Sequence, residues 1–77
     1  MVDLCKMELD KVGIIKKFNV IDNIKRRFLD IGITKDVKII RVLEDYSNNM
    51  SAYLIMGSLI AIRNKDTKGI KVIYEEV

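Results

Sequence analysis

Only one segment of this chain carries the spacing of a helix. Ile24, Phe28 and Ile31 recur at i, i+4 and i+7, which places their side chains on one helical stripe. Gly32 follows at the position where many helices end on a left-handed residue, a conformation that glycine adopts without steric penalty. These signals predict one well-defined, packed α-helix at about residues 23–31.

The other apolar segments are short and rich in Ile, Val, Leu and Tyr, which is typical of strands. A parallel sheet would need a helix between each pair of strands, and the pattern offers a single helix. Closing an antiparallel sheet on itself also removes exposed strand edges. We therefore predict a mainly β fold, a small β-barrel with one helix packed on it. The expected strands are residues 14–21, 37–43, 52–56, 58–63 and 70–75.

Polar and glycine residues mark where these elements begin and end. Asp22 is placed to cap the helix, with Asn23 as the alternative, because a side-chain oxygen there can accept a backbone N–H that lacks a partner in the first turn. Gly57, between two strand-like runs, indicates a tight hairpin. The polar stretch 44–51 carries Asn48 and Asn49, which tolerate positive φ, so we expect a loop there.

The chain is short enough to restrict its class. We expect one domain, residues 1–77, because 77 residues cannot bury two separate cores. A single cysteine, Cys5, excludes an internal disulfide and points to a reducing, cytoplasmic setting. No run has the length of a membrane span, and the N-terminus lacks the pattern of a signal peptide. We expect a cytoplasmic protein.

Residues suited to catalysis or to metal binding are sparse. The chain has no histidine, the commonest general acid or base and a frequent metal ligand. Cys5 lacks a base and lies near a terminus that we expect to be loosely held. The 11 acidic residues are scattered, and no phosphate-binding glycine loop occurs. We predict no enzyme activity, no catalytic residue and no metal site.

Three runs in the expected order resemble the FeoA family. Residues 25–33 (KRRFLDIGI) are similar to its helix motif, a basic pair leading into Leu-x-x-Leu-Gly-Leu. Residues 57–63 (GSLIAIR) are similar to its Gly-x-x-x-Ala-Leu-Arg strand, and residues 70–72 stand where its closing Ile-x-Val falls. Where the family commonly has Pro-Gly after the helix, this chain has residues 34–36 (TKD), so that turn must be built differently.

This resemblance implies an SH3-like β-barrel that serves as a small accessory or regulatory module of bacterial ferrous iron uptake. The implied partner is the cytoplasmic GTP-binding part of a FeoB-type iron permease, which would recruit the module to the inner face of the membrane. No cofactor is expected, although weak association with Fe²⁺ and weak self-association stay open.

The residues that we expect to contact the partner are Arg26, Arg27 and Leu29, all on the predicted helix. The plain alternatives are that the arginines form a solvated helix face and that Leu29 completes the helix packing. The residues of the motif that we expect to serve the structure are Asp22, Phe28, Gly32, Gly57 and Ala61.

Two other functions stay open. Similar barrels form the C-terminal domain of iron-dependent repressors, so the chain could be a transition-metal-sensing module, although it lacks a DNA-binding half. A small barrel could also bind nucleic acid, but the five Phe and Tyr residues are dispersed and the net charge is only +3. We therefore expect no nucleic acid partner.

Overall fold

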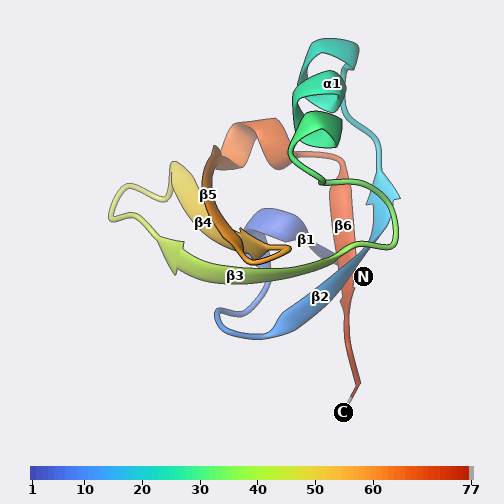
Figure 1. The fold of residues 1–77 in the computed structure, drawn as a ribbon. Helices are drawn as coiled ribbons and strands as arrows, with labels where there is room; N and C mark the ends of the chain where they lie inside the picture. Colours follow the sequence, from blue (N-terminus) through green and yellow to red (C-terminus); the bar gives the residue numbers. More distant parts are fainter. Residues whose placement is uncertain (77) are drawn as a thin grey trace.

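The computed structural model describes residues 1–76, which form six strands of one antiparallel sheet and three helices (Figure 1). The strands have the order β1-β6-β2-β3-β4-β5. Their bounds are β1 Val2–Asp3, β2 Val12–Phe18, β3 Lys38–Glu44, β4 Met50–Ile55, β5 Ser58–Arg63 and β6 Ile70–Tyr74. The helices are the 3₁₀ turn η1 Leu4–Lys6, the α-helix α1 Asp22–Asp30 and the 3₁₀ turn η2 Asn64–Thr67. The predicted mainly β fold with one α-helix is confirmed.

The sheet curls into a barrel whose two end strands do not pair. Irregularities between Ile15 and Lys17 and between Arg41 and Leu43 shift the register, and such bulges bend a sheet. Within residues 1–76, β1 pairs only with β6 and β5 only with β4. The predicted small barrel is therefore present, but it has an open seam that leaves one edge of β5 free.

Helix α1 ends as the sequence predicts. The N–H of Gly32 donates to the carbonyl of Leu29 (3.1 Å), and the N–H of Ile33 donates to the carbonyl of Phe28 (2.8 Å). These two bonds form a Schellman motif, which needs a left-handed residue, and Gly32 has φ +94°. Because Phe28 and Ile33 are both buried, the motif also joins the helix end to the core.

The start of α1 differs from the prediction. Ile21 is the cap residue: its backbone is extended (φ −68°, ψ 156°), and its carbonyl accepts from the N–H of Lys25 at 2.8 Å. Asp22 is already helical and makes no side-chain cap hydrogen bond, so the predicted cap at Asp22 is wrong. The chain turns into the helix one residue earlier than the polar pattern suggests. Asp22 still places a negative charge near the positive end of the helix dipole.

The apolar stripe of α1 is only partly covered. Phe28 is buried and packs on Phe18, with ring centroids 6.4 Å apart. Ile24 is half-buried, whereas Ile31 is 40% exposed. A short helix at one end of a barrel has few neighbours to pack against, so the C-terminal end of the stripe stays at the surface.

Strand β2 ends at Phe18, although the sequence predicts a strand over residues 14–21. The N–H of Asn19 donates to the carbonyl of Gly69 (3.0 Å), which ties the end of β2 to the start of β6. A Cβ at Gly69 would lie 2.0 Å from the carbonyl oxygen of Asn19, and Gly69 has φ +92°, so only glycine allows this approach. The strand therefore ends where the two backbones meet.

The N-terminal segment belongs to the core. Val2 and Asp3 pair with β6, and Leu4 and Met7 are fully buried. Cys5 is half-buried. The expected loosely held N-terminus is wrong, because β1 extends the sheet past β6 and places the side chains that follow it in the barrel interior. The other buried apolar side chains are Ile15, Phe28, Ile33, Ile39, Tyr53, Ile55, Ile62, Ile70 and Val72.

A tight hairpin joins β4 to β5. Ile55 pairs with Ser58, so the connection consists of Met56 and Gly57, which have φ +50° and +82°. Two consecutive left-handed residues match the turns that suit the twist of a hairpin. The predicted turn at Gly57 is confirmed. The methionine beside it occupies a backbone conformation that asparagine or glycine adopts more readily.

Candidate partner-binding groove

The free edge of β5 offers backbone groups without partners. In a two-residue hairpin the closing pair, here Ile55 and Ser58, is hydrogen-bonded, and hydrogen-bonded pairs then alternate along the ladder. By this alternation Ser58, Ile60 and Ile62 bond to β4. The N–H and C=O groups of Leu59 and Ala61 point away from β4, and no other backbone group of residues 1–76 pairs with them.

A groove runs between this edge and α1. Its volume is about 520 Å³, within the range of about 300–1,000 Å³ usual for ligand pockets. Residues 27, 28 and 30 of helix α1 and its C-cap residue Ile31 supply one wall, and residues 60–63 of β5 supply the other. Met50 and Asp66 complete the lining. The groove therefore places a trough with both apolar and charged lining residues beside the unpaired backbone of β5.

Charges of both signs rim the groove. Arg27 and Asp30 project from α1, and Arg63 and Asp66 stand where β5 meets η2. None of these four side chains takes part in an ion pair with another group of residues 1–76. Their charges sum to zero, so the rim does not favour a strongly charged ligand of either sign.

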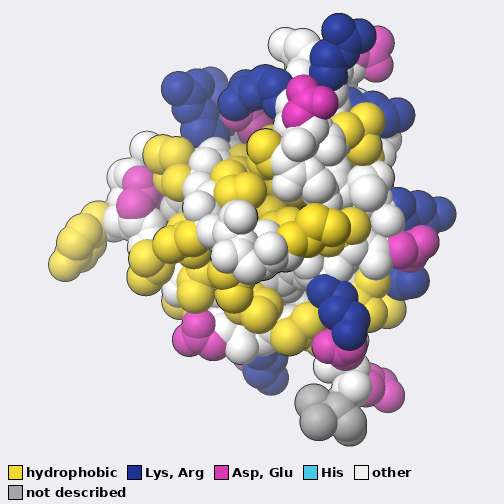
Figure 2. All heavy atoms as spheres, viewed as in Figure 1, with side chains coloured by type: hydrophobic (Ala, Val, Ile, Leu, Met, Phe, Trp, Pro, Cys, Tyr) yellow, Lys and Arg dark blue, Asp and Glu magenta, His cyan; other side chains and the backbone are white. Residues whose placement is uncertain are grey.

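The outer face of β3, β4 and β5 is also apolar and exposed. Leu54 lies opposite Leu59 across the β4–β5 ladder, and Ala52 lies opposite Ala61. Leu59 is 63% exposed and Leu43, on β3, is 61% exposed. Hydrophobic side chains gather over these strands in Figure 2. The groove is therefore continuous with a wider apolar surface, which is the kind of feature that marks protein contacts.

Comparison with known families decides what this module is. A model of the family described as FeoA domain matches residues 2–74, nearly the whole chain. The chain belongs to the FeoA family. FeoA domains form a family of small accessory domains of ferrous iron transport, not a family of enzymes. None of the curated proteins matches the chain significantly in sequence.

Solved structures share the FeoA fold at low sequence identity. Iron(II) transport protein A from Clostridium thermocellum matches with a TM-score of 0.88 at 16% identity, over 95% of this chain and 45% of that one. A crystal structure of an iron uptake regulatory protein, FeoA, matches with a TM-score of 0.80 at 19% identity, over 96% of both chains. A manganese-dependent transcriptional repressor matches with a TM-score of 0.80 at 17% identity, over 96% of this chain and 41% of that one. The chain thus spans less than half the length of the first and third of these.

The FeoA fold does not bring the three residues predicted to contact a partner together in one pocket. Arg27 lines the groove together with Phe28 and Ala61, which were expected to serve only the structure. Arg26 and Leu29 are exposed on α1 but do not line the groove. The three predicted contact residues therefore occupy two neighbouring surfaces of one helix rather than a single pocket.

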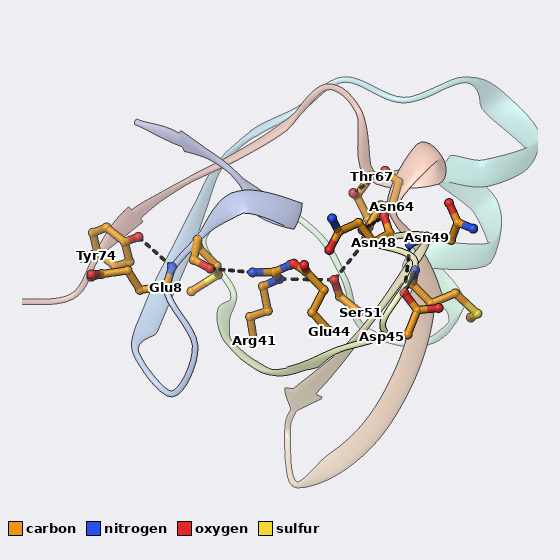
Figure 3. Close-up of polar contacts among 12 residues, drawn as sticks. Glu8, Arg41, Glu44, Asp45, Asn48, Asn49, Ser51, Asn64, Thr67 and Tyr74 are labelled. Carbon is orange, nitrogen blue, oxygen red and sulfur yellow. Dashed lines mark hydrogen bonds and ion pairs between the residues drawn. The ribbon is translucent and has the colours of Figure 1, made fainter.

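Arg41 is a buried residue that our sequence reasoning missed. It is 6% exposed, and its guanidinium donates to the carbonyl of Met7 (3.0 Å) and to the hydroxyl of Ser51 (3.2 Å) and pairs with Glu44 (Figure 3). Ser51 in turn donates to Asn64 at 2.8 Å. The signal was present, because Arg41 stands two residues after the apolar Ile39 and so shares its face of the strand.

The described residues converge on no metal site. No three His, Cys, Asp or Glu side chains of residues 1–76 lie where they could share an ion. Among the helices of this part of the chain, none has the length and apolar character that crossing a bilayer requires. The described residues do bring together an unpaired strand edge, a groove and an exposed helix face.

Proposed function

We propose that this FeoA domain is an accessory module of bacterial ferrous iron uptake that binds the cytoplasmic GTP-binding part of a FeoB-type permease. It works in the cytoplasm as a single domain, residues 1–77, and the permease recruits it to the inner face of the membrane. The observation that carries the proposal is the free β5 edge beside α1, with Arg27 in the groove and Arg26 and Leu29 exposed next to it. Family membership supplies the iron-transport setting.

The action of such a module is regulatory. A domain that binds one conformation of a GTPase more tightly than the other shifts the population toward that conformation. Coupling of this kind is typically worth about 1–3 kcal/mol, or roughly 5–150-fold in affinity. The module needs no bound cofactor for this, because its contribution is differential contact with the partner.

The decisive experiment measures binding of the full chain to the purified cytoplasmic domain of the permease by biolayer interferometry. The double variant Arg26→Glu, Leu29→Glu reverses one charge and removes one apolar contact on the exposed face of α1. We expect it to weaken binding about tenfold or more. Lys11→Glu is the matched control, since the turn before β2 lies far from α1 (Figure 1), and it should leave affinity nearly unchanged. Equal affinities of all three proteins would rule out the helix surface.

Metal sensing is the second candidate. The observation that favours it is the shared fold with a manganese-dependent transcriptional repressor, a likeness at 17% identity that concerns the fold. It predicts saturable binding of Fe(II) or Mn(II) to the isolated chain at micromolar concentration. Isothermal titration under anaerobic conditions tests this directly, and a flat titration removes the candidate.

A further inference from the structure

The two walls of the groove differ in what they offer a ligand. The α1 wall offers side chains, of which Phe28 is buried and Ile31 is 40% exposed. The β5 wall offers a strand edge, on which Leu59 and Ala61 present unpaired N–H and C=O groups. Donors and acceptors that alternate along a strand match one ligand above all, the backbone of another extended segment.

The charge balance favours the same ligand. The charges of Arg27 and Asp30 on one wall and of Arg63 and Asp66 at the end of the groove sum to zero, and the uncharged lining residues include Ile31, Met50 and Ile60. A nucleic acid or a highly acidic peptide would meet no net positive charge there. A peptide whose central residues are uncharged would bury apolar side chains without leaving a charge unpaired.

The helix also limits what can approach β5. A second sheet could pair with β5 only through its own edge strand. Its remaining strands would then have to occupy the space where α1 already forms the opposite wall of the groove. A single extended segment needs only one strand spacing, about 4.8 Å, beside β5. The shape therefore favours a lone peptide over a second copy of this chain.

We propose that the groove between β5 and α1 binds an extended peptide segment, which adds to the free edge of β5 as a further strand of the sheet. The segment has an uncharged centre with alternate apolar side chains, because neighbouring residues of a strand face opposite sides. Those side chains rest against the exposed part of Ile31 and against Ile60. The inference deepens the proposed function and rests on it, since the segment would belong to the permease partner.

The sharpest test changes one backbone N–H. Ala61→Pro removes the outward donor of Ala61, and the β4–β5 ladder keeps its bonds, because this position does not bond to β4. Ala61→Val is the matched control, since it keeps the N–H and alters the side chain alone. The probes are the permease's whole cytoplasmic domain and overlapping peptides of about 12 residues that cover it, measured by fluorescence polarisation.

We expect at least one peptide with alternate apolar residues to bind, Ala61→Pro to weaken it about tenfold or more, and Ala61→Val to retain binding within about threefold. Amide hydrogen exchange of Leu59 and Ala61 should slow when the whole domain is bound. If Ala61→Pro does not fold, the wild-type chain is tested with two N-methylated forms of the same peptide. One form carries the methyl groups on its odd-numbered residues and the other on its even-numbered residues. Only the form whose methyl groups block the bonds to β5 should lose affinity.

The outcomes separate the two proposals. If the whole domain binds but exchange at Leu59 and Ala61 is unchanged and Ala61→Pro binds normally, strand addition is wrong and the proposed function stands. If neither the domain nor any peptide binds, both are wrong. If Ala61→Pro instead abolishes a homodimer seen by analytical ultracentrifugation, β5 pairs with a second copy and the peptide proposal is wrong.

Discussion

The two edges of the sheet are built differently. The β1 edge is two residues long, carries the charged Asp3, which is hydrogen-bonded to Lys71, and leads directly into the buried Leu4. The β5 edge is six residues long, and its residues 58–62 carry no charge. Short strands, charges and covering segments are the means by which proteins protect a sheet edge from unwanted pairing. The β1 edge is short and charged, whereas the β5 edge is longer and carries a charge only at its last residue, Arg63.

This contrast indicates what each edge is for. The N-terminal segment closes one side of the barrel and contributes to its stability through buried side chains. The β5 edge stays unpaired within residues 1–76, and residues of α1 line the groove beside it. An exposed apolar edge is an aggregation hazard, so we interpret its presence as a binding feature.

The largest effect should appear when the segment that follows β1 and strand β5 each lose one leucine. Leu4→Ala removes a fully buried side chain and should lower the free energy of unfolding by about 2–5 kcal/mol. Leu59→Ala removes a side chain that is 63% exposed and should change it by about 0.5 kcal/mol or less. Urea denaturation followed by circular dichroism measures both. Equal losses for the two variants would contradict the division of roles between the edges.

A smaller effect should appear at the turn that positions β5. Met56 is 80% exposed and has φ +50°, so its backbone is strained while its side chain packs little. Met56→Asn should raise the free energy of unfolding by about 0.5–1 kcal/mol, because asparagine tolerates this conformation. Thermal unfolding checks the direction. A lower melting temperature would mean that the methionine side chain makes contacts that outweigh the strain.

The smallest effect concerns pH, and it should be confined to the β1 edge. The hydrogen bond from Lys71, followed by its charge, lowers the pKa of Asp3. A carboxyl group whose pKa is lower in the folded state stabilises the fold above its unfolded pKa, about 4, and this contribution is lost as pH falls through the folded pKa. The protection of the β1 amides against hydrogen exchange, taken relative to the intrinsic exchange rate at each pH, should therefore fall below about pH 4 more than the protection of the β5 amides, since β5 carries no carboxylate.

The pKa values of two other carboxyl groups are also lowered in the folded protein, so their contribution to the pH dependence must be distinguished from that of Asp3. The pKa of Asp36 is lowered by its hydrogen bond from Lys16, and that of Asp45 by backbone hydrogen bonds from Met50 and then Asn49. Asp3→Asn isolates the β1 term: it should raise exchange in β1 at neutral pH and flatten its acid dependence. If the variant and the wild type respond identically to acid, the Asp3–Lys71 pair has no role at this edge.

Local signals predicted the parts of the fold that local physics controls. Three apolar residues at helical spacing predicted the helix. Its end at Gly32 was predicted because a helix end often requires a backbone conformation that glycine adopts easily. The hairpin at Gly57 followed in the same way. The cap at Asp22 was predicted wrongly because the competing position, Ile21, is set by how the chain leaves the barrel and not by the side chain present.

The groove was only partly foreseen. Arg27 was expected at a surface, but its neighbours across the groove lie more than 30 positions away in sequence, on β5. Nothing local indicates that β5 would be an edge strand, since strand order depends on which segments pair. Arg41 was overlooked for a related reason, because burial of an arginine depends on the distant acceptor at Met7.

By itself, then, the sequence determined the type of each main element, the points where the chain turns and the FeoA family, because spacing and turn chemistry act over a few residues. The tertiary structure alone decided that the N-terminal segment closes one edge of the sheet, that β5 stays unpaired and that α1 stands opposite it. Those features depend on pairing between segments far apart along the chain, where register and packing are settled only when the whole barrel forms.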